Sequence, residues 1–180
     1  MNRSYVCMVR LGLIMSLIVP GLACAMSQVT LEATMTSAHN AAFGVGNLFK
    51  DPIASKDINN WNAVITEVEK FVKKNVTLNS DLTKAMKTLK EANTKIIAVI
   101  TDSYRLFFAK PDSKNDDLKR NTAASLQYVI DPILSVEKDL KAGIDKGHRL
   151  PGNQVAAQVL YRLAVSLSTT AEKAQRELRK

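Results

Sequence analysis

The sequence predicts an all-α protein, an antiparallel up-down bundle of four to five long helices, on three observations. Apolar residues recur at positions i, i+3, i+4 and i+7 through most of the chain, which is the period of an amphipathic helix. Only 7 Gly and 5 Pro occur in 180 residues, too few for a turn-rich β sandwich, and no segment keeps a strand-like alternation. The connections between the predicted helices are short, so consecutive helices are expected to run antiparallel.

The first 25 residues are predicted to be a signal peptide. Two arginines supply a basic start, residues 11–19 form an apolar run, and Ala23-Cys24-Ala25 has the small-x-small pattern of a cleavage site. The apolar run is about half of the ~20 residues that span a bilayer. Residues 26–180 are therefore expected to be exported and to form a single helical-bundle domain.

Both cysteines of the chain, Cys7 and Cys24, lie in this leader. Cleavage after Ala25 makes Met26 the first mature residue and leaves no disulfide, so stability has to come from a large core. In the alternative, Cys24 is the lipidated first residue of a bacterial lipoprotein. Leu22 lies one place too late for a good lipobox, which favours simple cleavage.

The charge of the chain gives little information about its partner. Loss of Arg3 and Arg10 with the leader lowers the formal net charge from +8 to +6. The basic residues are spread along the chain, which is typical of solvated helix faces. Nucleic acid is not expected as the partner of an exported protein, whereas peripheral contact with an anionic membrane or a cell-wall polysaccharide is an alternative.

The first two helices differ in how clearly the sequence predicts them. Residues 28–50 are expected to be helical, although Gly44 and Gly46 weaken the pattern. The next helix is predicted over 57–75, with Asp57 as its N-cap. Its apolar stripe consists of Trp61, Val64, Ile65, Val68, Phe71 and Val72.

Two longer helices are predicted to follow. The first covers 81–109, is capped by Ser80 and is about 40 Å long at 1.5 Å per residue. The second covers 114–146 and contains Pro132, which either kinks one helix or begins a new one. The apolar stripe keeps its phase across the proline, which favours a single kinked helix.

The last helix is predicted over 154–178. Gly147 is expected to be the C-cap of the preceding helix. Residues 150–153 form the connecting loop, and Asn153 is expected to cap the final helix.

Candidate chemistry is sparse, and neither an enzyme, a metal site nor a cofactor is expected. His39 and His148 are the only histidines, and no Cys-x-x-Cys-His motif for haem attachment is present. Gly44-Val45-Gly46 lacks the third glycine of a dinucleotide-binding loop. Glu67 and Glu69 lie two positions apart, on different faces of a helix, so they cannot form a paired acid–base site.

Two further residues are candidates for other roles. Asn75-Val76-Thr77 is an N-glycosylation sequon at a predicted helix–helix turn, which matters if the source is eukaryotic. Trp61 lies on the apolar stripe and is most simply a core anchor. In the alternative, a lone indole walls a ligand cavity.

A family resemblance involves mainly residues 120–178. The stretch Leu126 to Leu140 has the centre Ile130-Asp131-Pro132-Ile133, and a Lys/Gly turn at 145–151 precedes a final helix with regularly spaced leucines. This arrangement resembles the fungal hydrophobic surface binding protein A and cell-wall galactomannoprotein family. The resemblance implies a secreted or cell-wall helical bundle that binds fatty acids or apolar surfaces.

Export, helical stripes and the resemblance together favour a secreted, non-enzymatic protein that binds lipids or hydrophobic surfaces. The alternative is a bacterial periplasmic bundle with a structural or protein–protein interaction role, which needs only the same stripes and export signal. A helical-bundle enzyme or haem protein is disfavoured because its ligands are missing.

The predicted ligand is a long-chain fatty acid held between the helices. Ala85, Ala92, Ala156 and Ala164 interrupt the aliphatic stripes and would leave a slot in the interior, with a lysine near its mouth for the carboxylate. In the alternative, these alanines only allow the helices to approach closely. The predicted lining residues are Trp61, Phe71, Leu89, Ile96, Ile130 and Leu163.

Overall fold

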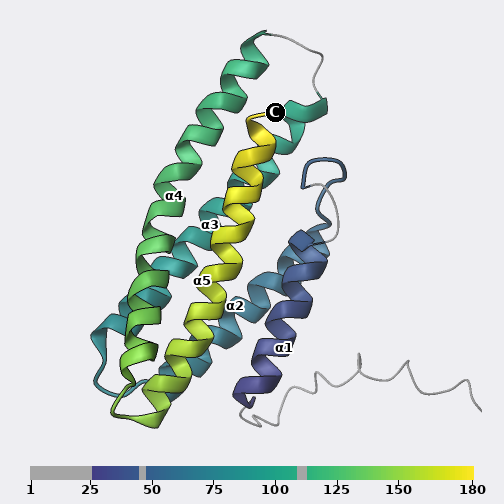
Figure 1. Cartoon of the computed structure of the whole chain (residues 1–180). Helices are drawn as coiled ribbons and strands as arrows, with labels where there is room; N and C mark the ends of the chain where they lie inside the picture. The colour runs from purple at the N-terminus through teal and green to yellow at the C-terminus, as the bar shows by residue number, and fades with distance from the viewer. Residues whose placement is uncertain (1–25, 45–47, 109–112) are drawn as a thin grey trace, which may run out of the picture.

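The computed structural model describes residues 26–44, 48–108 and 113–180, and within them it is an all-α up-down bundle without strands (Figure 1). The predicted leader, its cleavage site and Gly46 lie outside the described residues. The helices are α1 (Gln28–His39), followed by a π-helical turn η1 (Asn40–Gly44), α2 (Ser55–Asn75), α3 (Ser80–Phe108), α4 (Ser113–Lys146) and α5 (Pro151–Leu178).

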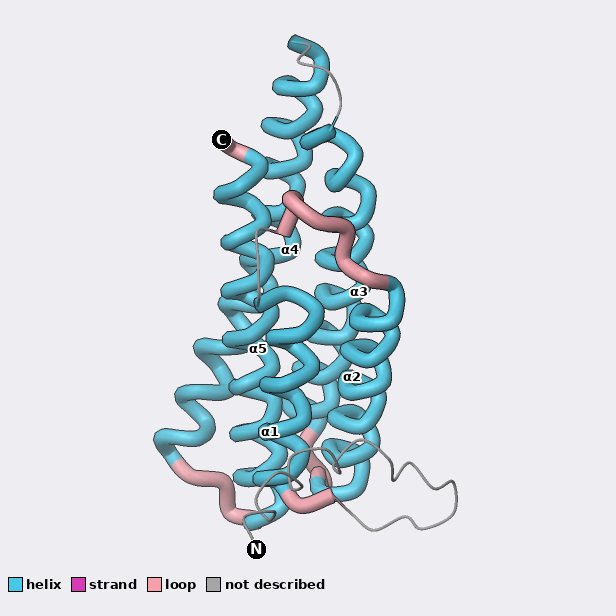
Figure 2. The backbone as a smooth tube through the Cα atoms, turned by 90° about the vertical axis from the view of Figure 1, so that its right-hand side faces the viewer, coloured by secondary structure: helices cyan, strands magenta, loops and turns pink. Residues whose placement is uncertain are grey.

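Helix α5 is the centre of the bundle. It packs against α1, α2, α3 and α4, while α1 otherwise packs on α2. Consecutive helices reverse direction along the chain, so α1, α3 and α5 run one way and α2 and α4 the other (Figures 1 and 2). The up-down topology predicted from the short connections is therefore confirmed.

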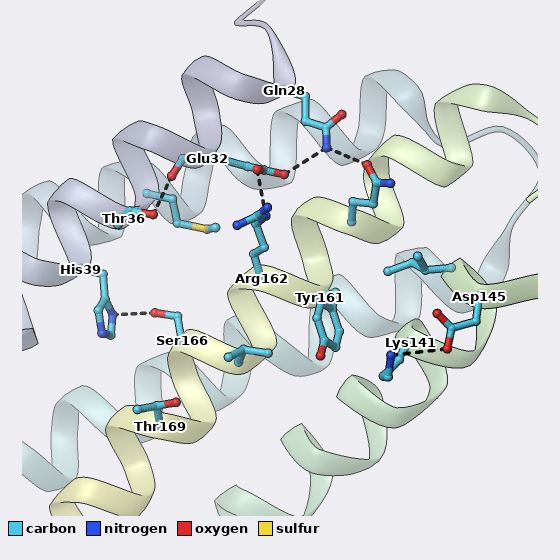
Figure 3. A pocket seen from close by; sticks show the side chains of 14 residues that line it. Gln28, Glu32, Thr36, His39, Lys141, Asp145, Tyr161, Arg162, Ser166 and Thr169 are labelled. Carbon is cyan, nitrogen blue, oxygen red and sulfur yellow. Dashed lines mark hydrogen bonds and ion pairs between the residues drawn. The ribbon is translucent and has the colours of Figure 1, made fainter. Parts of the chain in front are cut away.

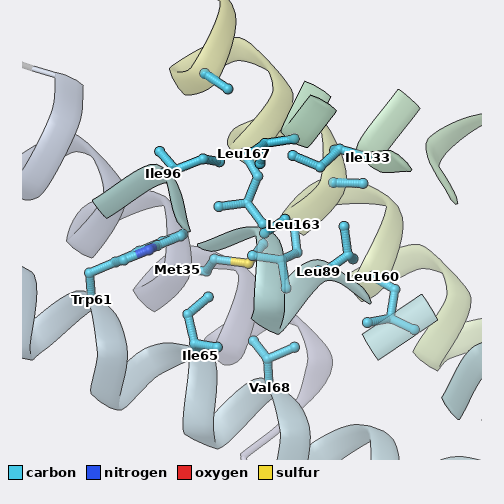
Figure 4. Close-up of a cluster of buried hydrophobic side chains, with 14 of the residues drawn as sticks. Met35, Trp61, Ile65, Val68, Leu89, Ile96, Ile133, Leu160, Leu163 and Leu167 are labelled. Atoms are coloured by element: carbon cyan, nitrogen blue, oxygen red, sulfur yellow. The ribbon is translucent and has the colours of Figure 1, made fainter. Parts of the chain in front are cut away.

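The core consists of the apolar stripes that the sequence predicts. Figure 4 shows Ile65 and Val68 of α2, Leu89 of α3 and Leu163 of α5 converging in the interior, with Met35 of α1 beside them. These side chains are buried. Removing such a side chain from water contributes about 1.5–3 kcal/mol, so the bundle can rest on aliphatic burial.

The helix ends differ from the prediction in three places. Helix α2 begins after Ala54, and Asp57 lies within the first turn rather than at the cap. Helix α3 is capped by Asn79, whose Oδ1 accepts hydrogen bonds from the backbone N–H groups of residues 81 and 82, and Ser80 is already helical. Helix α5 begins three residues early, after Leu150, because Pro151 is well suited to a first helical position.

Two other predictions about helix geometry are confirmed. Helix α4 continues through Pro132 as one helix, in line with the unbroken phase of its apolar stripe. Gly147 ends this helix with φ +72°, a left-handed conformation that favours glycine. None of the helices in the described part of the chain is apolar over a stretch long enough to cross a membrane.

Candidate functional site

Helix α1 lies parallel to α5 and is joined to it by polar side chains. Gln28 Nε2 donates to Gln158 Oε1 at 2.8 Å, and one turn later Arg162 Nε lies 2.9 Å from Glu32 Oε2. Both pairs are 130 positions apart in the sequence. Parallel helices rise equally per residue and so keep their register, which places polar groups of α1 and α5 opposite one another at each turn.

Helices α1 and α4 border the same face of α5, one along each edge. A groove of about 730 Å³ remains between them (Figure 3). A volume of this size is typical of small-molecule sites, which measure about 300–1,000 Å³. The floor of the groove is α5 and its walls are α1 and α4. Its lining residues are Gln28, Glu32, Met35, Thr36, His39, Lys141, Ile144, Asp145, Gln158, Tyr161, Arg162, Val165, Ser166 and Thr169.

The charged side chains of the groove form two pairs on opposite walls. The Glu32 side chain is only 16% exposed; it forms an ion pair with Arg162 and accepts a hydrogen bond from Gln28. On the α4 wall, Lys141 Nζ lies 3.4 Å from Asp145 Oδ2, and both side chains are exposed. Burial makes the Glu32 pair the more rigid of the two, whereas Lys141 is free to turn toward a ligand at little energetic cost.

Between the charged pairs, the groove has an apolar strip. It consists of Met35 of α1, Ile144 of α4, and Tyr161 and Val165 of α5. Met35 is buried and the other three are half-buried. The groove therefore combines apolar surface with nearby cations, as a site for an amphipathic molecule would.

His39 lies at the end of the groove that points toward the C-terminus of α5. Its Nδ1 is 2.6 Å from Ser166 Oγ and its Nε2 is 3.4 Å from Thr170 Oγ1. Burial, and to a smaller extent the positive charge of Lys173, lowers the pKa of His39 below its ordinary value of 6.5. Both ring nitrogens face hydroxyl groups, an arrangement that fixes the ring in place, and the imidazole is neutral near pH 7.

The rings of His39, Phe43 and Trp61 form one contact group that links the groove to the core. The centroid of the His39 ring is 5.5 Å from that of Phe43 and 5.3 Å from that of Trp61. The Trp61 indole is fully buried, and its Nε1 donates to Asn93 Oδ1 at 2.6 Å. Trp61 is therefore a core anchor. It does not line the groove, but it contacts His39, which does.

The six residues predicted to line a ligand site lie in the core and not in the groove. Phe71 is half-buried. Five are at most 2% exposed: Trp61, Leu89, Ile96, Ile130 and Leu163. The four alanines that were expected to open a slot, Ala85, Ala92, Ala156 and Ala164, are buried among the same side chains. An interior acyl site remains a prediction, and a ligand there would have to part packed helices.

The predicted glycosylation site lies at the end of α2. Asn75 is half-buried, and its Nδ2 donates to the carbonyl oxygen of Phe71 at 2.8 Å. Glycan attachment at Nδ2 would have to replace this contact. Modification of Asn75 remains a prediction.

Sequence reasoning missed the groove, although a signal for it is present. Polar residues recur every four positions in α1, at 28, 32 and 36, and α5 has polar residues with helical spacing at 158, 162, 166 and 169. Such strips on two helices indicate faces that are not packed in the core. The sequence does not reveal that α1 and α4 border the same face of α5. Within the described residues, no group of three or more His, Cys, Asp or Glu side chains is placed to hold a metal ion.

Comparisons of the chain with protein-family models, with curated proteins and with solved structures found no match. The geometry of the groove is therefore the main support for a functional assignment.

Proposed function

We propose that this protein is an exported, non-enzymatic helical bundle that binds an amphipathic lipid, with a long-chain fatty acid as the simplest ligand. The observation that supports the proposal is the groove between α1, α4 and α5, in which an apolar strip lies between cationic side chains. Secretion or cell-wall association follows from the predicted leader, with the bacterial periplasm as the alternative location.

The acyl chain would lie along Met35, Ile144 and Val165, with the Tyr161 ring beside it. Each methylene removed from water contributes about 0.8 kcal/mol, so partial burial of a long chain offsets part of the entropic cost of association. The carboxylate would meet Lys141 or Arg162. Arg162 contacts Glu32 through Nε, and its side chain is 64% exposed, so the guanidinium is accessible to an anion.

The groove is a better candidate than the interior slot for a physical reason. A ligand in the groove covers Ile144, Tyr161 and Val165, which are already partly exposed, whereas a ligand in the interior displaces side chains that are fully packed. Interiors are packed as densely as organic crystals, so opening them loses many dispersion contacts.

The alternative function is that of a structural or protein–protein interaction bundle. One observation favours it: α5 is packed by other helices on its remaining sides, and the groove residues 158, 162, 165 and 169 recur with helical spacing. A partner helix would fit such a face and complete the bundle.

A fluorescent fatty-acid titration tests the proposal. Ligand in the groove would touch His39 and so change the emission of Trp61, the only tryptophan. We expect saturable binding at micromolar ligand and about fivefold weaker binding for Lys141→Gln, the loss of roughly 1 kcal/mol for one exposed charge contact. Lys138→Gln, an exposed cation one turn away and outside the groove, is the matched control. Absence of a saturable change with the folded protein would contradict the proposal.

A further inference from the structure

The turn between α2 and α3 holds an apolar side chain in an unfavourable state. Leu78 has φ +49°, the sole positive φ of a non-glycine residue in the described parts of the chain, and its side chain is fully exposed. The left-handed region is disfavoured for residues with a Cβ, and an exposed leucine contributes nothing to the core. Folding alone therefore gives no reason for a leucine at this position.

Contacts with α5 fix this turn in place. The backbone N–H of Thr77 donates to Asn153 Oδ1 at 2.9 Å, and Asn153 Nδ2 donates back to the Thr77 carbonyl oxygen at 3.1 Å. Asn153 is buried. A Cβ on Gly152 would lie 2.4 Å from the carbonyl oxygen of Asn75, so only glycine permits this close approach. These contacts with α5 fix the turn in a conformation that exposes Leu78 to solvent.

A second misplaced leucine lies in the neighbouring turn. Leu150 occupies the N-cap of α5, makes no side-chain capping bond and is 43% exposed. Ser, Thr, Asp or Asn at this position would satisfy a free N–H group of the helix. The two turns lie side by side at one end of the bundle (Figure 1), because Asn153 joins them. Two leucines at one end thus occupy positions where local structure favours other residues.

Cations flank these two leucines in the sequence. Lys74, Lys146 and Arg149 are exposed and form no ion pair within the described residues. Asp81 is the one carboxylate in the segments 74–81 and 146–151, which we call the Leu78–Leu150 end. Exposed leucines flanked by lysine and arginine are the combination by which peripheral proteins bind anionic lipid surfaces.

We propose that the Leu78–Leu150 end docks on an anionic lipid membrane, with both leucines inserted below the headgroups and the three cations against the lipid phosphates. The inference does not depend on the groove, since it involves other residues and another ligand. It explains by one contact, with the membrane, both the leucine at positive φ (Leu78) and the leucine at the N-cap of α5 (Leu150).

The decisive variant is Leu78→Gly with Leu150→Ser. Glycine adopts positive φ freely and serine caps a helix, so the double variant keeps or raises the melting temperature. Binding is measured by co-sedimentation with phosphatidylcholine vesicles that contain phosphatidylglycerol. All variants are produced alike, so residues 1–25 are processed in the same way in each. We expect the double variant to bind about fivefold more weakly, or worse, while remaining fully folded.

Two controls test the location of the contact. Tyr128→Gln removes an exposed aromatic side chain from the middle of α4, and Phe108→Gln removes one from the opposite end of the bundle. Both are expected to bind vesicles as the parent chain does. Equal loss of binding in either control would overturn the assignment to the Leu78–Leu150 end, and so would undiminished binding of the double variant.

Charge provides the second arm of the test. Lys74→Gln with Arg149→Gln removes two cations from this end, and Lys95→Gln with Lys138→Gln removes the same charge elsewhere. We expect only the first pair to weaken binding, by about tenfold or more, and added salt to reduce the difference. Failure of the parent chain to bind anionic vesicles, or equal binding to vesicles of phosphatidylcholine alone, refutes the proposal and leaves the groove assignment untouched.

Discussion

Two polar residues join elements that are far apart in the chain. His39 ties α1 to α5 through the Ser166 hydroxyl, and Asn153 ties the α2–α3 turn to the start of α5. From the sequence, Asn153 was expected to cap α5. This expectation was wrong because α5 begins upstream, at Pro151, which leaves the Asn153 side chain for a long-range contact.

His39 is predicted to make the protein less stable as the solution becomes acidic. Its folded-state pKa lies below the ordinary value of 6.5, so its contribution to stability is fully present above pH 6.5 and is lost as the pH falls through the folded value. Urea unfolding at several pH values measures this slope. His39→Gln should flatten this slope relative to the parent chain.

The loss of stability due to Glu69 occurs at lower pH than the loss due to His39, so the two can be distinguished. Hydrogen bonds from Lys73 and Lys90 lower the pKa of Glu69 from 4.5 to about 2, so its contribution is present above pH 4.5 and is lost only as the pH falls toward 2. A stability loss in the parent chain that begins below pH 4.5, with none near pH 6, would contradict the role of His39.

Asn153→Ala is predicted to destabilise the fold by about 1–3 kcal/mol, because it removes both hydrogen bonds to the backbone of Thr77, each of which contributes about 0.5–1.5 kcal/mol. Urea unfolding provides the measurement. Asn121→Ala, at an exposed position of α4, is the matched control and should be neutral or slightly stabilising, since alanine is the better helix former. Equal effects of the two substitutions would show that Asn153 holds nothing together.

At the scale of elements, the long helices could be predicted and their ends could not. The apolar period continues for five or more turns in α2, α3, α4 and α5, and each was placed to within three residues at either end. The ends depend on single capping contacts, and Asn79 displaced Ser80 at α3 because its side chain reaches two backbone N–H groups. The segment 28–50 was the weakest prediction, since its helix changes to a π-helical turn at Asn40.

Helix α1 is predicted to open before the rest of the bundle. It buries two apolar side chains, Leu31 and Met35, and otherwise meets α5 through polar pairs, whereas α5 buries residues along its whole length. Local opening requires less free energy where few apolar contacts are lost. Amide hydrogen exchange should therefore be faster in α1 than in α5. Equal protection of the two helices would mean that the polar pairs hold α1 as firmly as the core holds α5.

At the scale of the whole molecule, the groove results from the arrangement of the helices. Each stripe predicts which residues of a helix are buried, and those residues form the observed core. The pattern of a single helix does not predict that α1 is short, that it lies parallel to α5, or that a gap remains between α1 and α4. The site proposed from the sequence was therefore placed in the core, where the apolar residues are, and the groove was missed.

Ligand binding across three helices is predicted to raise the melting temperature. A ligand that binds only the folded state stabilises it by about 2.7 kcal/mol at a hundred times its dissociation constant, which is roughly 5–10 °C for a domain of this size. A groove ligand would also slow amide exchange in α1, because it bridges that helix to α4 and α5. Thermal unfolding and amide exchange with a long-chain fatty acid measure the two effects together. A stabilised core with unchanged α1 exchange would place the ligand in the interior, among Leu89, Ile96 and Leu163, and would overturn the groove assignment.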